Sequence, residues 1–113
     1  MSDLFHGKCV PCTGKEPPLT SAEIEILLPQ VPEWQIEDVN GVPHLVRAFK
    51  LKNFVQALEF ANRVGAIAEE QEHHPSILVE YGKVTVSWWT HKIRGLHRND
   101  FIMAARTSQL LQE

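Results

Sequence analysis

The sequence predicts an α+β fold, a two-layer sandwich in which helices cover one face of an antiparallel four-stranded sheet, in the order αββαββα. Two observations carry this prediction. Two stretches of the chain alternate apolar and polar residues on either side of a short turn, which is the pattern of a β-hairpin. Before, between and after these hairpins, apolar residues recur at helical spacing. Because hairpins pair their strands antiparallel, helices with one apolar stripe are expected to cover one face of the resulting sheet.

The composition is that of a globular protein. A chain of 113 residues is typical of one domain and can bury a core without disulfides. Its net charge of −3 argues against a nucleic-acid partner, because nonspecific binding needs a basic face. No apolar run approaches the roughly 20 residues of a membrane span, and no secretory signal is evident. With two cysteines, too few for a disulfide framework, we expect a cytoplasmic protein with no membrane partner.

Residues 1–19 are predicted to form an irregular leader, because glycine and proline residues interrupt any periodicity there. Residues 20–113 are then the single folded domain. Its first helix is expected to begin at Thr20, which forms a capping box with Glu23. Pro29 should end this helix, since proline lacks an amide hydrogen.

The first hairpin follows the short helix. Residues 34–37 alternate apolar and polar side chains, and Asn40-Gly41 is a strong signal for a tight turn. The returning strand is predicted over residues 45–51, with Leu45 and Phe49 on the core face. A longer helix capped by Asn53 should then run to about residue 70, because Pro75 forbids its continuation. Its predicted core stripe consists of apolar residues at helical spacing: Phe54, Leu58, Ala61, Val64 and Ala68.

The second hairpin turns at Gly82-Lys83. Tyr81 is expected to be a packing residue of its first strand. In its second strand, alternate residues should face the core (Val84, Val86 and Trp88) and the opposite side (Thr85, Ser87, Trp89 and His91). The last helix is predicted to open at Asn99 or Asp100.

Histidines cluster in the second half of the chain. Four of them, His73, His74, His91 and His97, fall within 25 residues. The imidazole pKa lies near neutrality, so such a cluster is suited to proton transfer, although a single surface histidine is more often simply solvated. By strand alternation, His91 should point away from the core, whereas His73 and His74 lie in a tight connection that can aim them into a cleft. Trp89 could form the flat wall of a pocket for a planar ligand.

Metal binding is an alternative interpretation of the same residues. His73, His74, His91 and a carboxylate could ligate zinc, but neighbouring histidines seldom share one ion and no His-Glu-x-x-His motif is present. The segment from His6 through Cys9 to Cys12 offers three ligands without a fourth. Cys9 and Cys12 are also spaced like a redox pair, but no predicted strand precedes them. We therefore expect neither a metal nor a cofactor.

One constellation resembles a known family. An acidic residue, a His-His-Pro triplet, a tyrosine, a histidine and an aspartate follow one another at fixed spacing, as in the pterin-4a-carbinolamine dehydratases. The matching residues here are Glu69, His73, His74, Pro75, Tyr81, His91 and Asp100. The order of elements and Trp34 extend the resemblance over residues 20–113, whereas the leader lies outside it.

The resemblance implies a function. Members of the family dehydrate 4a-hydroxytetrahydropterin to quinonoid dihydropterin, without a metal, in the recycling of tetrahydropterin. It implies catalytic roles for His73, His74 and His91. It also implies a substrate-binding set made up of Glu69, Glu72, Trp89, Thr90 and Asp100. The implied partners are the pterin substrate, further copies of the chain in a homodimer or homotetramer, and a functional link to an aromatic amino-acid hydroxylase.

Other functions remain open within the resemblance. Some relatives are non-catalytic binding proteins, coactivators of a homeodomain transcription factor, or assembly factors for a carbon-fixing enzyme. Action on a pterin of molybdenum-cofactor metabolism is a further alternative. The presence of all three imidazoles favours catalysis, because a scaffold has no need of them.

Overall fold

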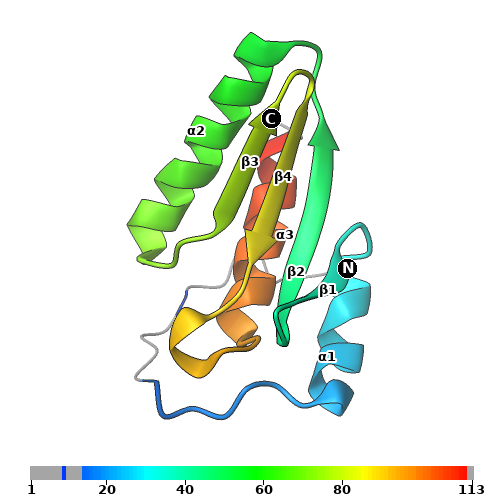
Figure 1. Cartoon of the computed structure of the whole chain (residues 1–113), viewed down its shortest axis with the longest axis vertical. Helices are drawn as coiled ribbons and strands as arrows, with labels where there is room; N and C mark the ends of the chain where they lie inside the picture. Colours follow the sequence, from blue (N-terminus) through cyan, green and yellow to red (C-terminus); the bar gives the residue numbers. More distant parts are fainter. Residues whose placement is uncertain (1–8, 10–13, 112–113) are drawn as a thin grey trace.

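The computed structural model describes residue 9 and residues 14–111. In this part of the chain the elements follow the predicted order (Figure 1), with two short 3₁₀ helices added. They are α1 (Ser21–Leu27), η2 (Leu28–Gln30), β1 (Gln35–Val39), β2 (Val42–Lys50), α2 (Phe54–Gln71), β3 (Ser76–Glu80), β4 (Lys83–Trp88), η3 (His91–Ile93) and α3 (Arg98–Leu111).

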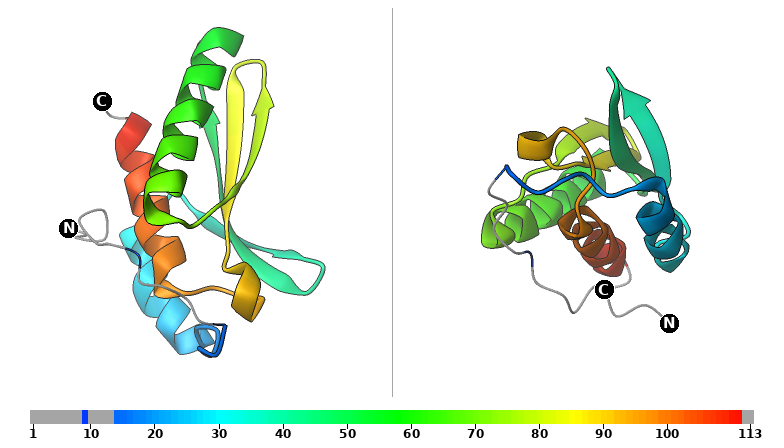
Figure 2. Two further views of the ribbon diagram at one scale, coloured as in Figure 1. Left: turned by 90° about the vertical axis from the view of Figure 1, so that its left-hand side faces the viewer. Right: turned by 90° about the horizontal axis from the view of Figure 1, so that it is seen from below.

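The strands form one antiparallel sheet in the order β1-β2-β4-β3. The two hairpins therefore lie side by side, with β2 and β4 in the centre. Helices α2 and α3 cover one face of this sheet, as Figure 2 (left) shows. The predicted α+β class and the order αββαββα are thus confirmed.

Local capping signals explain where the helices begin. Thr20 accepts a hydrogen bond from the Glu23 amide, and the Glu23 side chain accepts one from the Thr20 amide, so the predicted capping box is confirmed. The Asn53 side chain accepts from the amide of Gln56 and caps α2 in the same way. Pro29 lies in η2, where the chain has already left α1.

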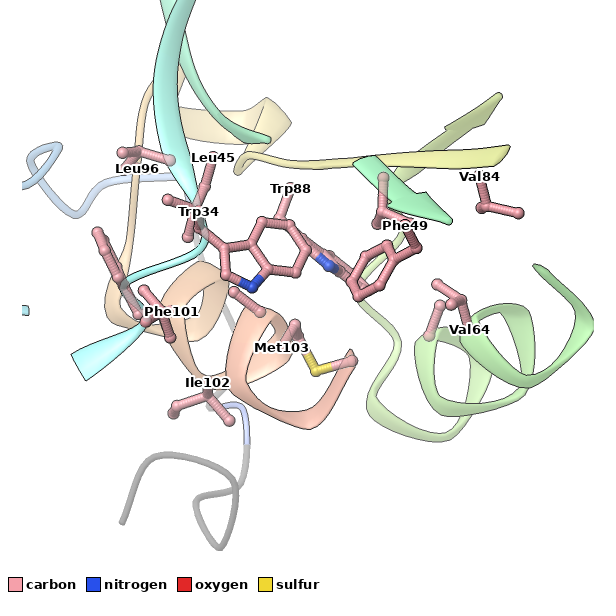
Figure 3. Packing of buried hydrophobic residues seen from close by; sticks show 14 of the residues in the cluster. Trp34, Leu45, Phe49, Val64, Val84, Trp88, Leu96, Phe101, Ile102 and Met103 are labelled. Carbon is pink, nitrogen blue, oxygen red and sulfur yellow. The ribbon is translucent and has the colours of Figure 1, made fainter. Parts of the chain in front are cut away.

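Aromatic side chains dominate the core between the sheet and the helices. Figure 3 shows Trp34, Phe49 and Trp88 gathered beside Met103, and all four are buried. Both indole groups are satisfied there: the Nε1–H of Trp34 donates to Ser108 and that of Trp88 donates to Thr107. The predicted core face of β4 is confirmed, since Val84, Val86 and Trp88 are fully buried.

Two predictions about packing were wrong. The predicted stripe of α2 includes Phe54 and Leu58, but these side chains are 45% and 43% exposed. The residues of α2 that are buried are Ala57, Phe60, Val64 and Ala68. Apolar residues occur on two sides of this helix, and the position of the sheet decides which side is covered. Tyr81 is 77% exposed in the turn after β3 and does not pack, because the strand ends at Glu80.

Candidate active site

Five of the predicted site residues line one open pocket of about 560 Å³, whereas Glu69, Trp89 and Asp100 are not part of its lining. Its walls come from the end of α2, the connection to β3, the loop between β4 and α3, and the start of α3. The lining residues include the three predicted catalytic histidines, together with Glu72 and Thr90. Other lining residues were not predicted from the sequence: Cys9, Glu70, Gln71, Lys92 and Asn99. The volume is in the range of pockets that enclose small organic ligands.

The end of α2 places the paired histidines. Glu72 adopts a left-handed conformation with φ of 53°, and the amide of His73 bonds back to the carbonyl of Ala68. This reversal ends the helix, and Pro75 then leads into β3. The two adjacent histidines consequently emerge from a tight connection and take different partners.

His73 is held by a buried carboxylate. Its Nε2 lies 2.6 Å from Oδ1 of Asp100, its ring stacks parallel to Trp88, and its side chain is only 11% exposed. Because a carboxylate only accepts hydrogen bonds, Nε2 of His73 must carry the hydrogen of this contact. Nδ1 is then the nitrogen of His73 that can exchange a proton.

Asp100 is in turn held from its other side. Its Oδ2 accepts hydrogen bonds from the Thr90 hydroxyl and from the His97 amide, both at 2.8 Å. The side chain is fully buried in the first turn of α3, where the helix dipole favours a negative charge. Asp100 therefore contacts His73 from behind the pocket wall, and the hydroxyl of the lining residue Thr90 holds Asp100 in place.

His74 also bonds to a carboxylate through Nε2, but this pair is exposed at the surface. Its Nε2 lies 2.5 Å from Oε2 of Glu69, and the two side chains are 59% and 78% exposed. Glu69 reaches His74 from one turn back on α2. Glu72 is exposed at the pocket rim.

His91 enters the pocket from a different type of element than predicted. The sequence placed it on the second strand of the hairpin, but β4 ends at Trp88 and His91 begins η3. An isolated bridge between Thr90 and Gly95 closes this loop. His91 is exposed, and its ring lies 4.3 Å from that of Trp89.

His44 is a neighbour of the site that was not singled out from the sequence. It comes from β2, and its ring stacks on Trp89 at 3.9 Å with nearly parallel planes. Burial, followed by the nearby His91, lowers the pKa of His44 below its usual value. The pairing of Leu45 with Trp88 brings His44 next to Trp89, and this cross-strand register is not encoded locally. Trp89 thus contacts imidazoles and is not part of the pocket lining.

The sequence offered two alternative metal sites, one formed by the histidines with a carboxylate and one by His6, Cys9 and Cys12. Within residue 9 and residues 14–111, no three histidine, cysteine or acidic side chains converge as metal ligands do. His6 and Cys12 lie outside the described residues.

Among residue 9 and residues 14–111, no helix has the length and apolar character needed to cross a bilayer.

The fold and the site together define a class of protein. It is a small α+β domain whose imidazoles, two of them bonded to carboxylates, line one pocket suited to proton transfer on a small molecule. Residues 17–110 match the family described as pterin 4 alpha carbinolamine dehydratase, and the chain belongs to this family.

Relatives resemble the chain over its full length. A protein from Nitrosococcus oceani, provisionally named pterin-4-alpha-carbinolamine dehydratase, is 54% identical over 99% of both chains. A protein of the same provisional name from Marinobacter nauticus is 56% identical over 97% of this chain and 99% of its own.

Solved structures agree with the fold. A transcriptional coactivator/pterin dehydratase from Brucella melitensis superposes with a TM-score of 0.74 at 31% identity, covering 82% of this chain and 97% of the other. A pterin dehydratase-like protein identified as a RuBisCO assembly factor gives 0.58 at 22% identity, covering 69% and 88%. The second likeness is one of fold alone.

Proposed function

We propose that this protein dehydrates 4a-hydroxytetrahydropterin to quinonoid dihydropterin by histidine acid/base catalysis, in the recycling of tetrahydropterin. Membership of the family and the names of the full-length relatives support a dehydratase. The observation that carries the mechanism is the bond between His73 and the buried Asp100, at a pocket that His74 and His91 also line.

The reaction needs one proton removed and one supplied. The N5–H bond of the pterin breaks, and its electron pair forms the C4a=N5 double bond. The C4a–O bond breaks at the same time, and its electron pair leaves with the hydroxyl group, which takes up a proton and departs as water. Imidazoles can perform both transfers near neutral pH, and each well-placed transfer is worth about 10²–10⁴-fold.

His73 is best suited to be the base in this scheme. Its Nε2–H is committed to Asp100, so Nδ1 accepts the proton from N5. The imidazolium that forms then faces a buried carboxylate, which Thr90 and His97 already hold in place. A buried carboxylate stabilises the imidazolium of Ser-His-Asp triads in the same way. Asp100 and Thr90 are therefore positioning residues in this proposal, not direct contacts of the pterin.

The remaining residues divide between acid chemistry and binding. His91 lines the pocket from the opposite loop and is the candidate that protonates the leaving hydroxyl. His74, which bonds to Glu69 at the surface, binds the pterin, and Glu72 contacts its polar edge from the rim. Trp89 supports the ring of His91.

The test is the rate of 4a-hydroxytetrahydropterin breakdown with and without the protein. We expect His73→Ala and His91→Ala each to lower kcat at least about tenfold, since each removes one proton transfer. Glu80→Gln is a control for a substitution away from the site, because Glu80 is an exposed residue of β3 outside the pocket and pairs only loosely with Lys83. Wild-type turnover in the double variant would refute the acid/base roles. No acceleration by the wild-type protein would refute the enzyme and favour a binding role.

We also propose that the chain assembles as a homodimer or homotetramer. Phe54, Val55 and Leu58 leave an apolar strip exposed on α2, with exposed fractions of 45%, 64% and 43%. A symmetric copy would remove this strip from water. Light scattering should therefore give a multiple of 12.9 kDa at micromolar concentration, and Val55→Asp should lower it. A mass of one chain for the wild type at all concentrations would contradict the assembly.

A further inference from the structure

His44 is a buried imidazole on the face of the sheet that α2 and α3 leave open. Leu45, its neighbour in β2, is fully buried on the helix-covered face, so strand alternation turns His44 to the opposite face. The side chain of His44 is nevertheless buried, and the residue is only 8% exposed. Another group must therefore cover it, and that group comes from the loop that leads into the candidate site.

Trp89, the residue that follows β4, covers His44. The two rings lie 3.9 Å apart, and their planes are within 8° of parallel. The same indole contacts His91, at 4.3 Å between ring centroids and 38° between planes. Trp89 thus contacts an imidazole from β2 and an imidazole that lines the pocket. We refer to these three rings, His44, Trp89 and His91, as the ring stack.

The backbone between Trp89 and His91 is fixed at Thr90. The Thr90 amide donates to the carbonyl of Gly95 at 2.9 Å, and its buried hydroxyl donates to Asp100. Both ring-bearing residues therefore start from a fixed point of the chain. The His91 side chain is exposed, so burial does not restrict its rotation. The indole beside it does, because a ring at this distance blocks part of that rotation.

At neutral pH the ring of His44 is uncharged. Burial, followed by the nearby His91, lowers the pKa of His44 below its usual value. Carboxylates that face it act in the opposite direction, namely Asp100, Asp38 and Glu37. The uncharged ring can pack flat on the indole without bringing a second positive charge close to His91, which must carry a proton before it can act as the acid.

His44 and Trp89 can affect the proposed reaction only through another residue. Neither is part of the pocket lining, whereas His91 is. An acid must hold its proton within hydrogen-bond reach of the leaving hydroxyl, and a displacement of about 1 Å can cost about 10²-fold in rate. A group that limits the rotation of His91 therefore supports the chemical step without touching the pterin.

We propose that His44 and Trp89 are positioning residues for His91: the ring of His44 fixes the indole, and the indole aims His91 into the pocket. This inference rests on the proposed function, in which His91 protonates the leaving hydroxyl. The acid is then positioned by a ring from β2, much as Asp100 positions the base from α3.

The first test is the kinetics of His44→Ala. Loss of the ring frees Trp89 to rotate, so kcat should fall about tenfold while KM changes less than about twofold, because His91 acts only in the chemical step. His44→Phe keeps a flat ring on the indole and should retain most of the wild-type kcat. Val46→Ala is the matched control, because Val46 is a buried residue on the same strand and the same face. A wild-type kcat in His44→Ala, or an equal loss in Val46→Ala, would overturn the proposal.

A double-mutant cycle shows whether His44 acts through His91. In the His91→Ala background the group that the ring stack aims is gone, so adding His44→Ala should lower kcat by less than about twofold. If the two losses multiplied in the double variant, His44 would act elsewhere and the proposal would be overturned.

Nuclear magnetic resonance tests the ring stack without relying on catalysis. Protons above the face of an indole resonate upfield, so the Hδ2 and Hε1 resonances of His91 should lie upfield in the wild type. They should move downfield in His44→Ala and stay in place in Val46→Ala. Unmoved resonances in His44→Ala would overturn the proposal, even where the wild type is an active dehydratase. If they move and the wild type does not accelerate dehydration, the ring stack is supported and the proposed function alone is refuted.

Discussion

His73 and His74 are neighbours in the chain, and each bonds to a carboxylate through Nε2, yet the two pairs differ sharply in their surroundings. The side chains of His73 and Asp100 are 11% and 0% exposed. Those of His74 and Glu69 are 59% and 78% exposed. The partner of His73 is 27 residues away on another helix, whereas the partner of His74 is on the helix that has just ended.

In the proposed mechanism, this difference separates a fixed proton-transfer group, His73, from an adaptable binding group, His74. A buried carboxylate with further hydrogen bonds cannot turn away, so it holds His73 in one orientation and one tautomer. A surface ion pair is screened by water and typically contributes at most about 1 kcal/mol. His74 is therefore free to exchange Glu69 for a ligand.

The largest effect is expected from Asp100→Asn. The amide oxygen can still accept from Thr90 and His97, which turns the NH₂ group towards His73 and forces its Nε2 to become an acceptor. Nδ1 then carries the hydrogen and cannot act as the base. We expect kcat to fall about 10²-fold or more with little change in KM, as for tautomer-setting carboxylates elsewhere. If the folded variant kept the wild-type kcat, the bond between His73 and the buried Asp100 would not contribute to catalysis.

A smaller effect is expected at the exposed pair. Glu69→Gln removes the charge partner of His74, and His74→Ala removes the imidazole itself. Because the pair is solvated, Glu69→Gln should change KM by less than about threefold, whereas His74→Ala should raise KM more and leave kcat closer to wild type. A loss of kcat at His74 as large as that at His73 would remove the distinction between the two histidines.

The smallest effect concerns His44, a buried imidazole stacked on Trp89. Its lowered pKa means that the unfolded chain binds a proton more readily than the folded one. Stability should therefore be complete above about pH 6.5 and decline as the pH falls through the lower pKa of the folded state. His44→Phe keeps a ring against Trp89 but cannot titrate. Between pH 7 and 5 its melting temperature should fall less than that of the wild type, and an equal fall would contradict the expectation.

The fold was predictable where its signals are local. The capping residues Thr20 and Asn53 and the Asn40-Gly41 turn act within a few residues, and each holds in the structure. Alternation in β4 correctly identified its core face because it depends only on neighbouring residues. It failed beyond Trp88, where the Thr90–Gly95 bridge turns the chain into η3 and places His91 in a loop.

The sequence by itself determined the class of fold, the order of the elements and the cluster of histidines, since capping, turns and periodicity are short-range properties. The tertiary structure alone decided which apolar side of α2 is covered, because two sides are apolar and only the sheet distinguishes them. It alone also decided that Asp100 lies behind His73, that His44 stacks on Trp89, and that Cys9 reaches Gln71, 62 residues away. Such contacts join segments that approach only when the core has packed, so no local pattern of residues can indicate them.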